Sequence, residues 1–246
     1  MSLKNLVYKI ISKIKIIKLF TQNIYSLLSF KVSYAQCGED LIILEYLKSQ
    51  NINKGKYLDI GAFHPIYISN TYLLHKNNFF GYVVDLDEEK LDNFKFYRGS
   101  KVKIILSAIT NSYQKIIKVY KFKKKILPSE YDTASLDFAN YVQTKFKINY
   151  ITENIKNTHI NDLFKSVGKI DFLNLDLEGL EFECLLSADL NLINPAIIVV
   201  KYRKYNQVYD EKINNYFEKN NYKFLVKSGL FLGYAKFTNQ EDTKII

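Results

Sequence analysis

Short apolar stretches alternate with amphipathic ones from residue 55 onward, and this alternation constrains the fold more than any other feature of the sequence. The stretches that we expect to be strands are residues 56–62, 81–86, 101–109, 169–177 and 195–202. Those that we expect to be helices are residues 69–78, 88–97, 161–167, 181–188 and 211–220. Repeated strand–helix units predict an α/β fold in which helices cover both faces of a parallel sheet.

The last part of the chain departs from this rhythm. Residues 222–226 and 230–237 are expected to form two strands that turn at Ser228 and Gly229. Such a hairpin places one antiparallel strand in an otherwise parallel sheet of about seven strands. The 246 residues suit one domain of this kind with an appendage, and we expect the domain to cover residues 32–246.

Residues 111–150 also interrupt the alternation. Residues 115–123 look like one strand of an extra hairpin, and residues 128–141 are polar and rich in turn-forming residues. We interpret the region as an insertion that covers a site, and not as a separate domain.

The N-terminal segment, residues 1–31, carries six lysines and no acidic residue, in a chain whose net charge is +10. Apolar residues recur in it at helical spacing, which predicts a basic amphipathic helix. Two interpretations stay open. The helix lies on an anionic membrane surface, or it packs on the domain or on a second subunit as part of an oligomer.

The amino-acid composition limits the cellular compartments and the binding partners that we expect for this protein. Two cysteines without a CxxC pattern indicate reduced thiols, and lysines interrupt every apolar run that could serve as a signal peptide. We therefore expect a cytoplasmic protein, with residues 1–30 as an alternative peripheral contact with the inner membrane face. Only two of the 35 basic residues are arginines, the residue that nucleic-acid recognition favours, so we expect no nucleic-acid partner.

Acidic residues stand where several predicted strands end. The first strand ends in Asp59-Ile60-Gly61-Ala62, the second has Asp85 at its end, and Asp176 and Glu178 stand at the end of the fourth. Because open α/β sheets bind ligands outside the carboxyl ends of their strands, we expect these side chains to share one site.

The loop after the first strand discriminates between cofactors. A dinucleotide site needs the pattern G-x-G-x-x-G to hold pyrophosphate, and here Gly61 stands alone before Phe63 and His64. S-adenosylmethionine needs no such cradle, and acidic residues attract its sulfonium and ammonium groups. Asp85 follows Gly61 by 24 residues, close to the spacing of an acid that binds ribose hydroxyls.

Five segments together resemble the FkbM family of methyltransferases in order and spacing. They are residues 34–40 (YAQCGED), 57–65 (YLDIGAFHP), 69–71 (SNT), 157–164 (NTHINDLF) and 169–181 (KIDFLNLDLEGLE). The resemblance covers about residues 33–200. It implies a Rossmann-like class I methyltransferase fold, S-adenosylmethionine as cofactor, and O-methylation of a sugar or a surface-glycan precursor.

The resemblance also implies roles for single residues. The cofactor-binding residues would be Gln36, Gly38, Asp59, Gly61, Ala62, Asn70, Thr71, Asp85, Ser107 and Ala108. Asp176 and Glu178 would face the methyl group and the acceptor. The sequence departs from the family pattern at Lys201, where an acid usually ends the fifth strand, and at Leu86, where a proline usually follows the acid. Because of the first departure, the resemblance does not define the acceptor pocket.

Methylation of a hydroxyl also requires a group that accepts the proton. We expect Asp176 or Glu178 to be this base, and His64 to be the next candidate. Plainer alternatives exist for each of them. The two acids could cap the following helix or bind Mg²⁺, Asp59 could be a structural turn residue, and His64 could shape its loop.

Other functions stay open at this stage. A nucleic-acid methyltransferase would suit the net charge, but the Asn/Asp-Pro-Pro-aromatic run of amino-methylating enzymes is missing from the sequence. A non-catalytic, membrane-associated scaffold would suit the N-terminal helix, but it would not need the acidic residues. We predict no metal cofactor, and the sequence does not reveal which acceptor is used.

Overall fold

The computed structural model describes residues 31–122, 131–202 and 209–236. The chain divides into two compact units, Met1–Val32 and Ser33–Ile246, and nearly all described residues belong to the second. The amphipathic helix predicted for residues 1–31 lies outside the described residues, apart from Lys31.

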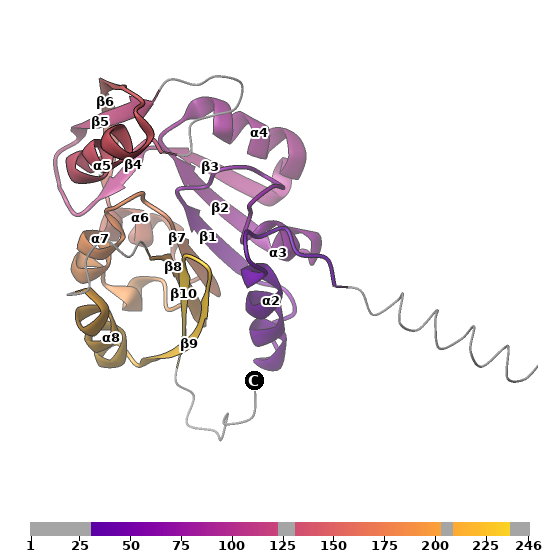
Figure 1. Cartoon of the computed structure of the whole chain (residues 1–246). Coiled ribbons are helices and arrows are strands. Elements are labelled where there is room, and N and C mark those ends of the chain that lie inside the picture. Colours follow the sequence, from indigo (N-terminus) through magenta and orange to yellow (C-terminus); the bar gives the residue numbers. More distant parts are fainter. Residues whose placement is uncertain (1–30, 123–130, 203–208, 237–246) are drawn as a thin grey trace, which may run out of the picture. The chain divides into compact units, whose positions relative to one another are not determined.

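The second unit is built on a seven-stranded sheet with the strand order β3-β2-β1-β7-β8-β10-β9 (Figure 1). Its strands are β1 (Lys56–Ile60), β2 (Phe80–Asp85), β3 (Val102–Leu106), β7 (Phe172–Leu175), β8 (Ile197–Lys201), β9 (Tyr222–Ser228) and β10 (Phe231–Lys236). β10 runs antiparallel to its neighbours β8 and β9, and the other pairs are parallel. The predicted fold class is confirmed, including the single antiparallel strand.

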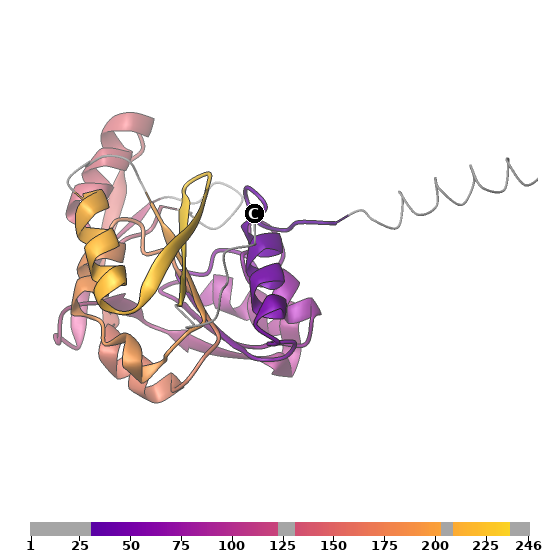
Figure 2. The same cartoon turned by 90° about the horizontal axis from the view of Figure 1, so that it is seen from below.

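Helices cover both faces of this sheet, as Figure 2 shows. One face carries α2 (Glu39–Ser49), α3 (Tyr72–Lys76) and α4 (Glu88–Arg98). The other face carries α6 (Ile160–Val167), α7 (Glu181–Ser187) and α8 (Tyr209–Lys219). Helix α2 was not predicted.

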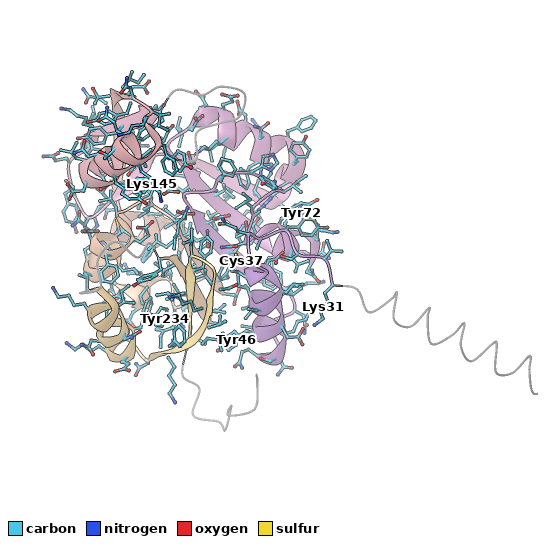
Figure 3. All side chains as sticks on the ribbon, in the orientation of Figure 1. Lys31, Cys37, Tyr46, Tyr72, Lys145 and Tyr234 are labelled. Atoms are coloured by element: carbon cyan, nitrogen blue, oxygen red, sulfur yellow. The ribbon has the colours of Figure 1, made fainter. Side chains whose placement is uncertain are left out.

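Alternate side chains of each central strand enter two separate cores. In β8, Ile198 and Val200 pack toward α6–α8, whereas Ile197 and Val199 pack toward α2–α4. Because both faces are buried, these strands appear in the sequence as continuous apolar runs. Figure 3 shows side chains on both sides of the sheet, and its labelled Tyr234 stacks on a ring of α8.

The predicted strand at residues 101–109 is wrong as a single element. β3 ends at Leu106, and β4 (Ala108–Thr110) pairs instead with β6 (Tyr150–His159), an unpredicted strand of a second sheet with the order β4-β6-β5. Between them, the Ser107 hydroxyl lies 2.9 Å from the carbonyl oxygen of Ala108 and 3.2 Å from that of Lys156 in β6. A short polar side chain that competes for backbone groups in this way ends a strand readily.

Residues 128–141 are also not simply turns. Helix α5 (Leu136–Phe146) starts within them, and the Ser135 hydroxyl accepts the Phe138 N–H at its first turn. Three side chains of α5 are buried with Phe122 of β5 (Ile116–Phe122), namely Phe138, Ala139 and Val142. The narrow apolar face of this helix is easily hidden by its polar composition.

Within the described ranges, no helix is both long and apolar enough to cross a membrane.

Candidate functional site

A cavity opens at the carboxyl ends of the central strands, beside the point where the sheet order passes from β1 to β7. It contains about 1040 Å³ of empty space, part of which is open to solvent. Ligands of open α/β sheets bind at such a switch point. The predicted site residues that line the cavity are Gln36, Asp59, Gly61, Ala62, His64, Asn70, Asp85, Ser107, Ala108, Asp176 and Glu178.

Two further predicted site residues take other positions. Thr71 is fully buried and bonds Asp59 with its hydroxyl. Gly38 precedes the first residue of α2 with a φ of 87°. Both are placed to hold the structure around the cavity, and neither is among the residues that line it.

Gly61 allows the ends of β1 and β7 to approach one another. Its φ is +80°, a value that favours glycine, and a Cβ atom at this position would collide with the carbonyl oxygen of Asp176. The Asp176 N–H in turn donates to the Ile60 carbonyl at 2.9 Å. The glycine therefore brings the two strand ends, and the acids that follow them, into one site.

Asp59 is buried and fixed by hydrogen bonds. Thr71 Oγ1 donates to its Oδ2 at 2.6 Å, and Asn174 Nδ2 donates to its Oδ1 at 2.8 Å. Asn70 Nδ2 extends the network by donating to Asn174 Oδ1 at 2.9 Å. Burial raises the pKa of Asp59, and Thr71 is first among the groups that oppose the rise. These bonds support the alternative of a structural role, while contact with a cofactor stays a prediction.

Arg98, which the sequence analysis missed, holds the loop between β1 and α3. Its Nε and Nη2 atoms donate to the Pro65 carbonyl at 3.0 and 2.6 Å. The guanidinium also donates to Ser69 Oγ at 2.8 Å, Thr71 Oγ1 at 2.9 Å and the Tyr57 hydroxyl at 2.8 Å. The signal available in the sequence was its rarity, since lysine supplies nearly all other basic residues.

Asp85 has a cationic partner that was not predicted. Lys90 Nζ lies 3.6 Å from Asp85 Oδ1, both side chains are 6% exposed, and the Asp87 N–H donates to the same oxygen at 2.8 Å. Burial raises the pKa of Asp85 to about 6, although Lys90 opposes the rise. The group is therefore mainly ionised at neutral pH.

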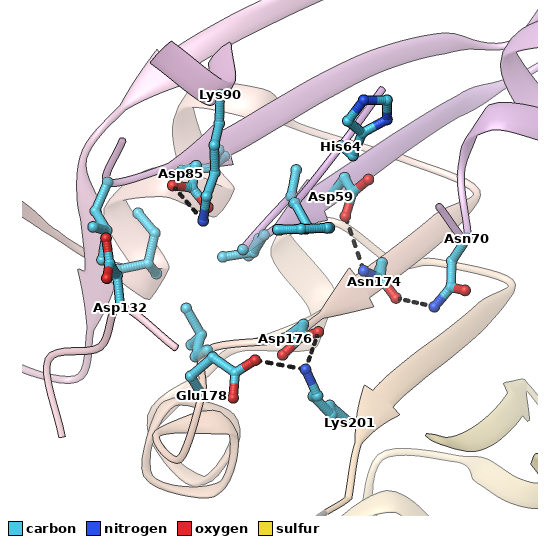
Figure 4. Close-up of a pocket in the computed structure, with 18 of the residues that line it drawn as sticks. Asp59, His64, Asn70, Asp85, Lys90, Asp132, Asn174, Asp176, Glu178 and Lys201 are labelled. Atoms are coloured by element: carbon cyan, nitrogen blue, oxygen red, sulfur yellow. Dashed lines mark hydrogen bonds and ion pairs between the residues drawn. The ribbon is translucent and has the colours of Figure 1, made fainter. Parts of the chain in front are cut away.

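Lys201 joins the two acids that follow β7, as Figure 4 shows. Its Nζ lies 2.8 Å from Asp176 Oδ2 and 2.6 Å from Glu178 Oε1. The ammonium group thus takes the position between the carboxylates that a Mg²⁺ ion would need. This contact argues against the alternative that the two acids bind Mg²⁺. It also explains how a lysine fits where the family usually has an acid.

The helix-capping alternative for the same two acids is wrong. Glu181 instead accepts the N–H groups of Leu177 and Gly179 at 2.9 and 3.0 Å. Burial, followed by the charges of Asp176 and Glu178, raises the pKa of Glu181 to about 8. Glu181 therefore shapes the loop and leaves the other two side chains at the cavity.

His64 is placed to shape its loop. Its Nδ1 accepts the N–H groups of Ile66 and Tyr67 at 3.1 and 2.9 Å. In the neutral ring the proton then lies on Nε2, so neither nitrogen can accept another proton without giving up these bonds. Burial also lowers the pKa of His64. The structure therefore favours the plainer alternative over a catalytic base.

The region 111–150 forms part of the cavity wall. Asp132 and Ala134 line it, and Thr133 Oγ1 donates to the Glu178 carbonyl at 2.8 Å. The Phe122 N–H holds Asp132 by donating to its Oδ1 at 2.9 Å.

Among the described residues of the wall, the charged groups are mostly acidic, although the chain carries a net charge of +10. The acids are Asp59, Asp85, Asp132, Asp176 and Glu178, and the lysines are Lys90 and Lys201. Such a wall suits a ligand with positive groups, like the sulfonium and ammonium of S-adenosylmethionine. Pyrophosphate fits poorly, because the β1 loop offers only one glycine and no lysine.

A family model described as the methyltransferase FkbM domain matches residues 59–224, which is most of the chain. The chain belongs to the FkbM methyltransferase family. It is therefore an S-adenosylmethionine-dependent methyltransferase, and the cofactor predicted from the sequence is confirmed at the level of the family. A search of curated proteins found no significant match.

Among solved structures, the FkbM chain is similar to magnesium protoporphyrin IX methyltransferase from Synechocystis, which has bound S-adenosylmethionine (11% identity, TM-score 0.42, 81% of this chain and 78% of that one). It is also similar to a TehB-like methyltransferase from Corynebacterium glutamicum (11% identity, TM-score 0.43, 89% of this chain and 97% of that one). A third similar structure is precorrin-6y C5,15-methyltransferase from Geobacter metallireducens (12% identity, TM-score 0.41, 85% of this chain and 95% of that one). At this level of similarity the neighbours say nothing about this chain's acceptor or partners.

Proposed function

We propose that this FkbM-family protein is an O-methyltransferase that acts on a hydroxyl group of a sugar or surface-glycan precursor. The observation that carries the proposal is the acidic cavity at the strand ends of a basic chain, with Asp176 and Glu178 in its wall. A carboxylate in this position can take the proton of an acceptor hydroxyl. The sugar acceptor itself rests on the family resemblance.

The cavity offers groups for each end of the cofactor. Asp85 would accept hydrogen bonds from the ribose hydroxyls, and Ser107 and Ala108 would flank the adenine. Gly61 and Ala62, which both line the cavity, would lie along the methionine end. Gln36, which lines the cavity from the segment before α2, would close over the cofactor.

The reaction needs alignment and one proton transfer. When bound, S-adenosylmethionine would supply an activated methyl group for the acceptor oxygen, with its sulfur as the leaving group that keeps the electron pair. The protein aligns the acceptor hydroxyl with that methyl group. A carboxylate at the end of β7 accepts the hydroxyl proton, so no free alkoxide has to form.

Calorimetric titration of the purified protein with S-adenosylhomocysteine, beside NAD and the Asp85→Ala variant, tests the donor site. We expect micromolar binding of S-adenosylhomocysteine, none of NAD, and a large loss of affinity in the variant. Absence of S-adenosylhomocysteine binding to folded protein would contradict the proposal and favour a non-catalytic scaffold.

Transfer of a tritiated methyl group to a panel of free sugars, nucleotide sugars and surface polysaccharide tests the acceptor class. Asp176→Asn and Glu178→Gln should both be assayed on any acceptor found. Full activity in both variants would show that neither carboxylate is the base. Transfer only to acceptors without a hydroxyl group would contradict O-methylation.

A further inference from the structure

Lys201 engages only one oxygen of each carboxylate at the end of β7. It bonds Asp176 through Oδ2 and Glu178 through Oε1, and its own side chain is 10% exposed. Lys201 ends β8, which pairs with β7 in parallel register, so the sheet itself sets the separation of Lys201 and Asp176. The ammonium group is therefore held in one position by both carboxylates, unlike a lysine side chain at the surface.

The second oxygen of each carboxylate, Asp176 Oδ1 and Glu178 Oε2, is buried, so the two acids are separated by where their backbones place them and not by burial. No described residue donates a hydrogen bond to Asp176 Oδ1. Asp176 lines the cavity beside Gly61 and Leu177. A buried carboxylate oxygen without a donor is costly in a folded protein, and it indicates a donor that arrives with a ligand.

Glu178 is held differently. Its backbone has a φ of 49°, an uncommon value for a residue with a side chain, and Thr133 Oγ1 bonds its carbonyl oxygen at 2.8 Å. The backbone conformation of Glu178 and its bond to Thr133 hold the residue in place, so we assign it a structural role. Beyond the effect of burial, the charges of both acids raise the pKa of Glu181, and the charge of Asp176 also raises the pKa of Asp59 on β1.

We propose that Asp176, and not Glu178, faces the transferred methyl group and accepts the acceptor's proton on Oδ1, while Lys201 is a positioning residue that holds Oδ2. This inference rests on the proposed function and deepens it. The proton passes from the acceptor oxygen to Oδ1 as the carbon–oxygen bond forms, and the Lys201 ammonium keeps its own protons.

Sinefungin tests the inference without any acceptor. It resembles S-adenosylmethionine but has a carbon atom in place of the sulfur and an ammonium group in place of the transferred methyl group. A carboxylate oxygen beside the methyl position should bind this ammonium, so the wild-type protein should prefer sinefungin to S-adenosylhomocysteine by about 10- to 100-fold. Calorimetric dissociation constants for both ligands give the preference directly.

The variants separate the two acids. Asp176→Asn should lose the preference for sinefungin and keep its affinity for S-adenosylhomocysteine, which also shows that it is folded. Glu178→Gln should keep most of the preference. Asp162→Asn, a matched loss of charge at an exposed site on α6, should change neither affinity. If Asp176→Asn fails to fold, Asp176→Ser replaces it.

The positioning role of Lys201 has its own measurement. Without the ammonium that holds Oδ2, the Asp176 carboxylate can turn away from the methyl position, so Lys201→Met should lose most of the preference for sinefungin and keep its affinity for S-adenosylhomocysteine. Lys201→Arg keeps the charge and should restore much of the preference. A merely structural role would lower both affinities together and leave their ratio unchanged.

Three results would overturn the inference. They are equal affinity of the wild-type protein for the two ligands, a preference that is lost in Glu178→Gln but kept in Asp176→Asn, and an unchanged preference in Lys201→Met. A protein that binds neither ligand would contradict the proposed function instead, so the two failures can be told apart.

Discussion

The carboxyl group of Asp85 combines burial with a buried cationic neighbour, which makes its charge sensitive to pH near neutrality. Its pKa is raised to about 6, so the group gains a proton as the pH falls through that value. Because a protonated carboxyl accepts hydrogen bonds from ribose hydroxyls less well than a carboxylate, cofactor affinity should follow this titration.

We predict that the affinity for S-adenosylhomocysteine is constant above about pH 7 and falls by roughly tenfold between pH 7 and pH 5. Asp85→Asn should bind weakly at every pH and show a flatter dependence. Calorimetry at pH 5.0, 6.0, 7.0 and 8.0 measures both, with Asp92→Asn on the exposed face of α4 as the control. A fall of equal size in Asp85→Asn would assign the titration to another group.

At the same scale, the sequence predicted the acids of the site but not their partners. Asp59, Asp85, Asp176 and Glu178 could be found because each one lies within three residues of the end of an apolar strand. Lys90 and Lys201 could not be paired with them, since those contacts depend on how distant strands and helices pack. Asn174 did leave a signal, as a polar residue within the buried strand FLNL.

At the scale of elements, the loop between β1 and α3 depends on one buried side chain. Arg98 donates five hydrogen bonds to the loop and its surroundings, and it is 3% exposed. No other described side chain donates hydrogen bonds to Pro65, Ser69 and Thr71 together. The position of the loop in the cavity wall therefore rests on Arg98.

Arg98→Met should destabilise the protein by about 3 kcal/mol, because it leaves several buried acceptors without a donor. For a domain of this size the loss corresponds to a fall in Tm of roughly 6–12 °C. Arg98→Lys should recover only part of the lost stability, since an ammonium group cannot replace the planar set of N–H donors on the guanidinium. Thermal unfolding followed by circular dichroism measures the shift, and Lys95→Met on the exposed face of α4 should stay within about 0.5 kcal/mol of wild type.

Gly61 gives a second prediction for the junction of β1 and β7. Gly61→Ala combines an unfavourable φ with a collision against the Asp176 carbonyl, whereas Gly168→Ala has a φ of +69° and open space around the new Cβ. Gly168→Ala should therefore cost about 1 kcal/mol of stability and leave ligand binding unchanged. Gly61→Ala should cost more and weaken S-adenosylhomocysteine binding at least tenfold, and similar behaviour of the two variants would mean that close approach does not shape the site.

The elements that the sequence predicted well are those buried on both sides of the large sheet. Their apolar runs are long, and each is bounded by a turn or a helix start. The prediction was wrong at residues 101–109 because one apolar run serves two sheets, and the single serine at the break gave no visible signal. It was incomplete at α5 and β6 because these elements bury only one narrow face.

At the scale of the whole molecule, positive charge and the candidate site lie in different parts of the sequence. Residues 1–31 contribute six lysines without an acid, whereas the cavity is lined by acidic side chains between Gln36 and Phe231. The separation suggests two independent binding activities, one for the cofactor and one for an anionic surface. The interpretation of residues 1–31 as a membrane contact remains a proposal, beside the alternative of packing on the domain or on a second subunit.

Removal of residues 1–30 tests this separation. The shortened protein should bind S-adenosylhomocysteine with unchanged affinity, because every described residue that lines the cavity is retained. Its association with vesicles of anionic phospholipid should be lost, while the full-length protein should bind them with an affinity that falls as salt is added. Sedimentation with vesicles of anionic and of neutral lipid, at low and at physiological salt, measures this. Unchanged sedimentation after the deletion would remove the membrane interpretation, and a change in oligomeric state by light scattering would favour packing on a second subunit.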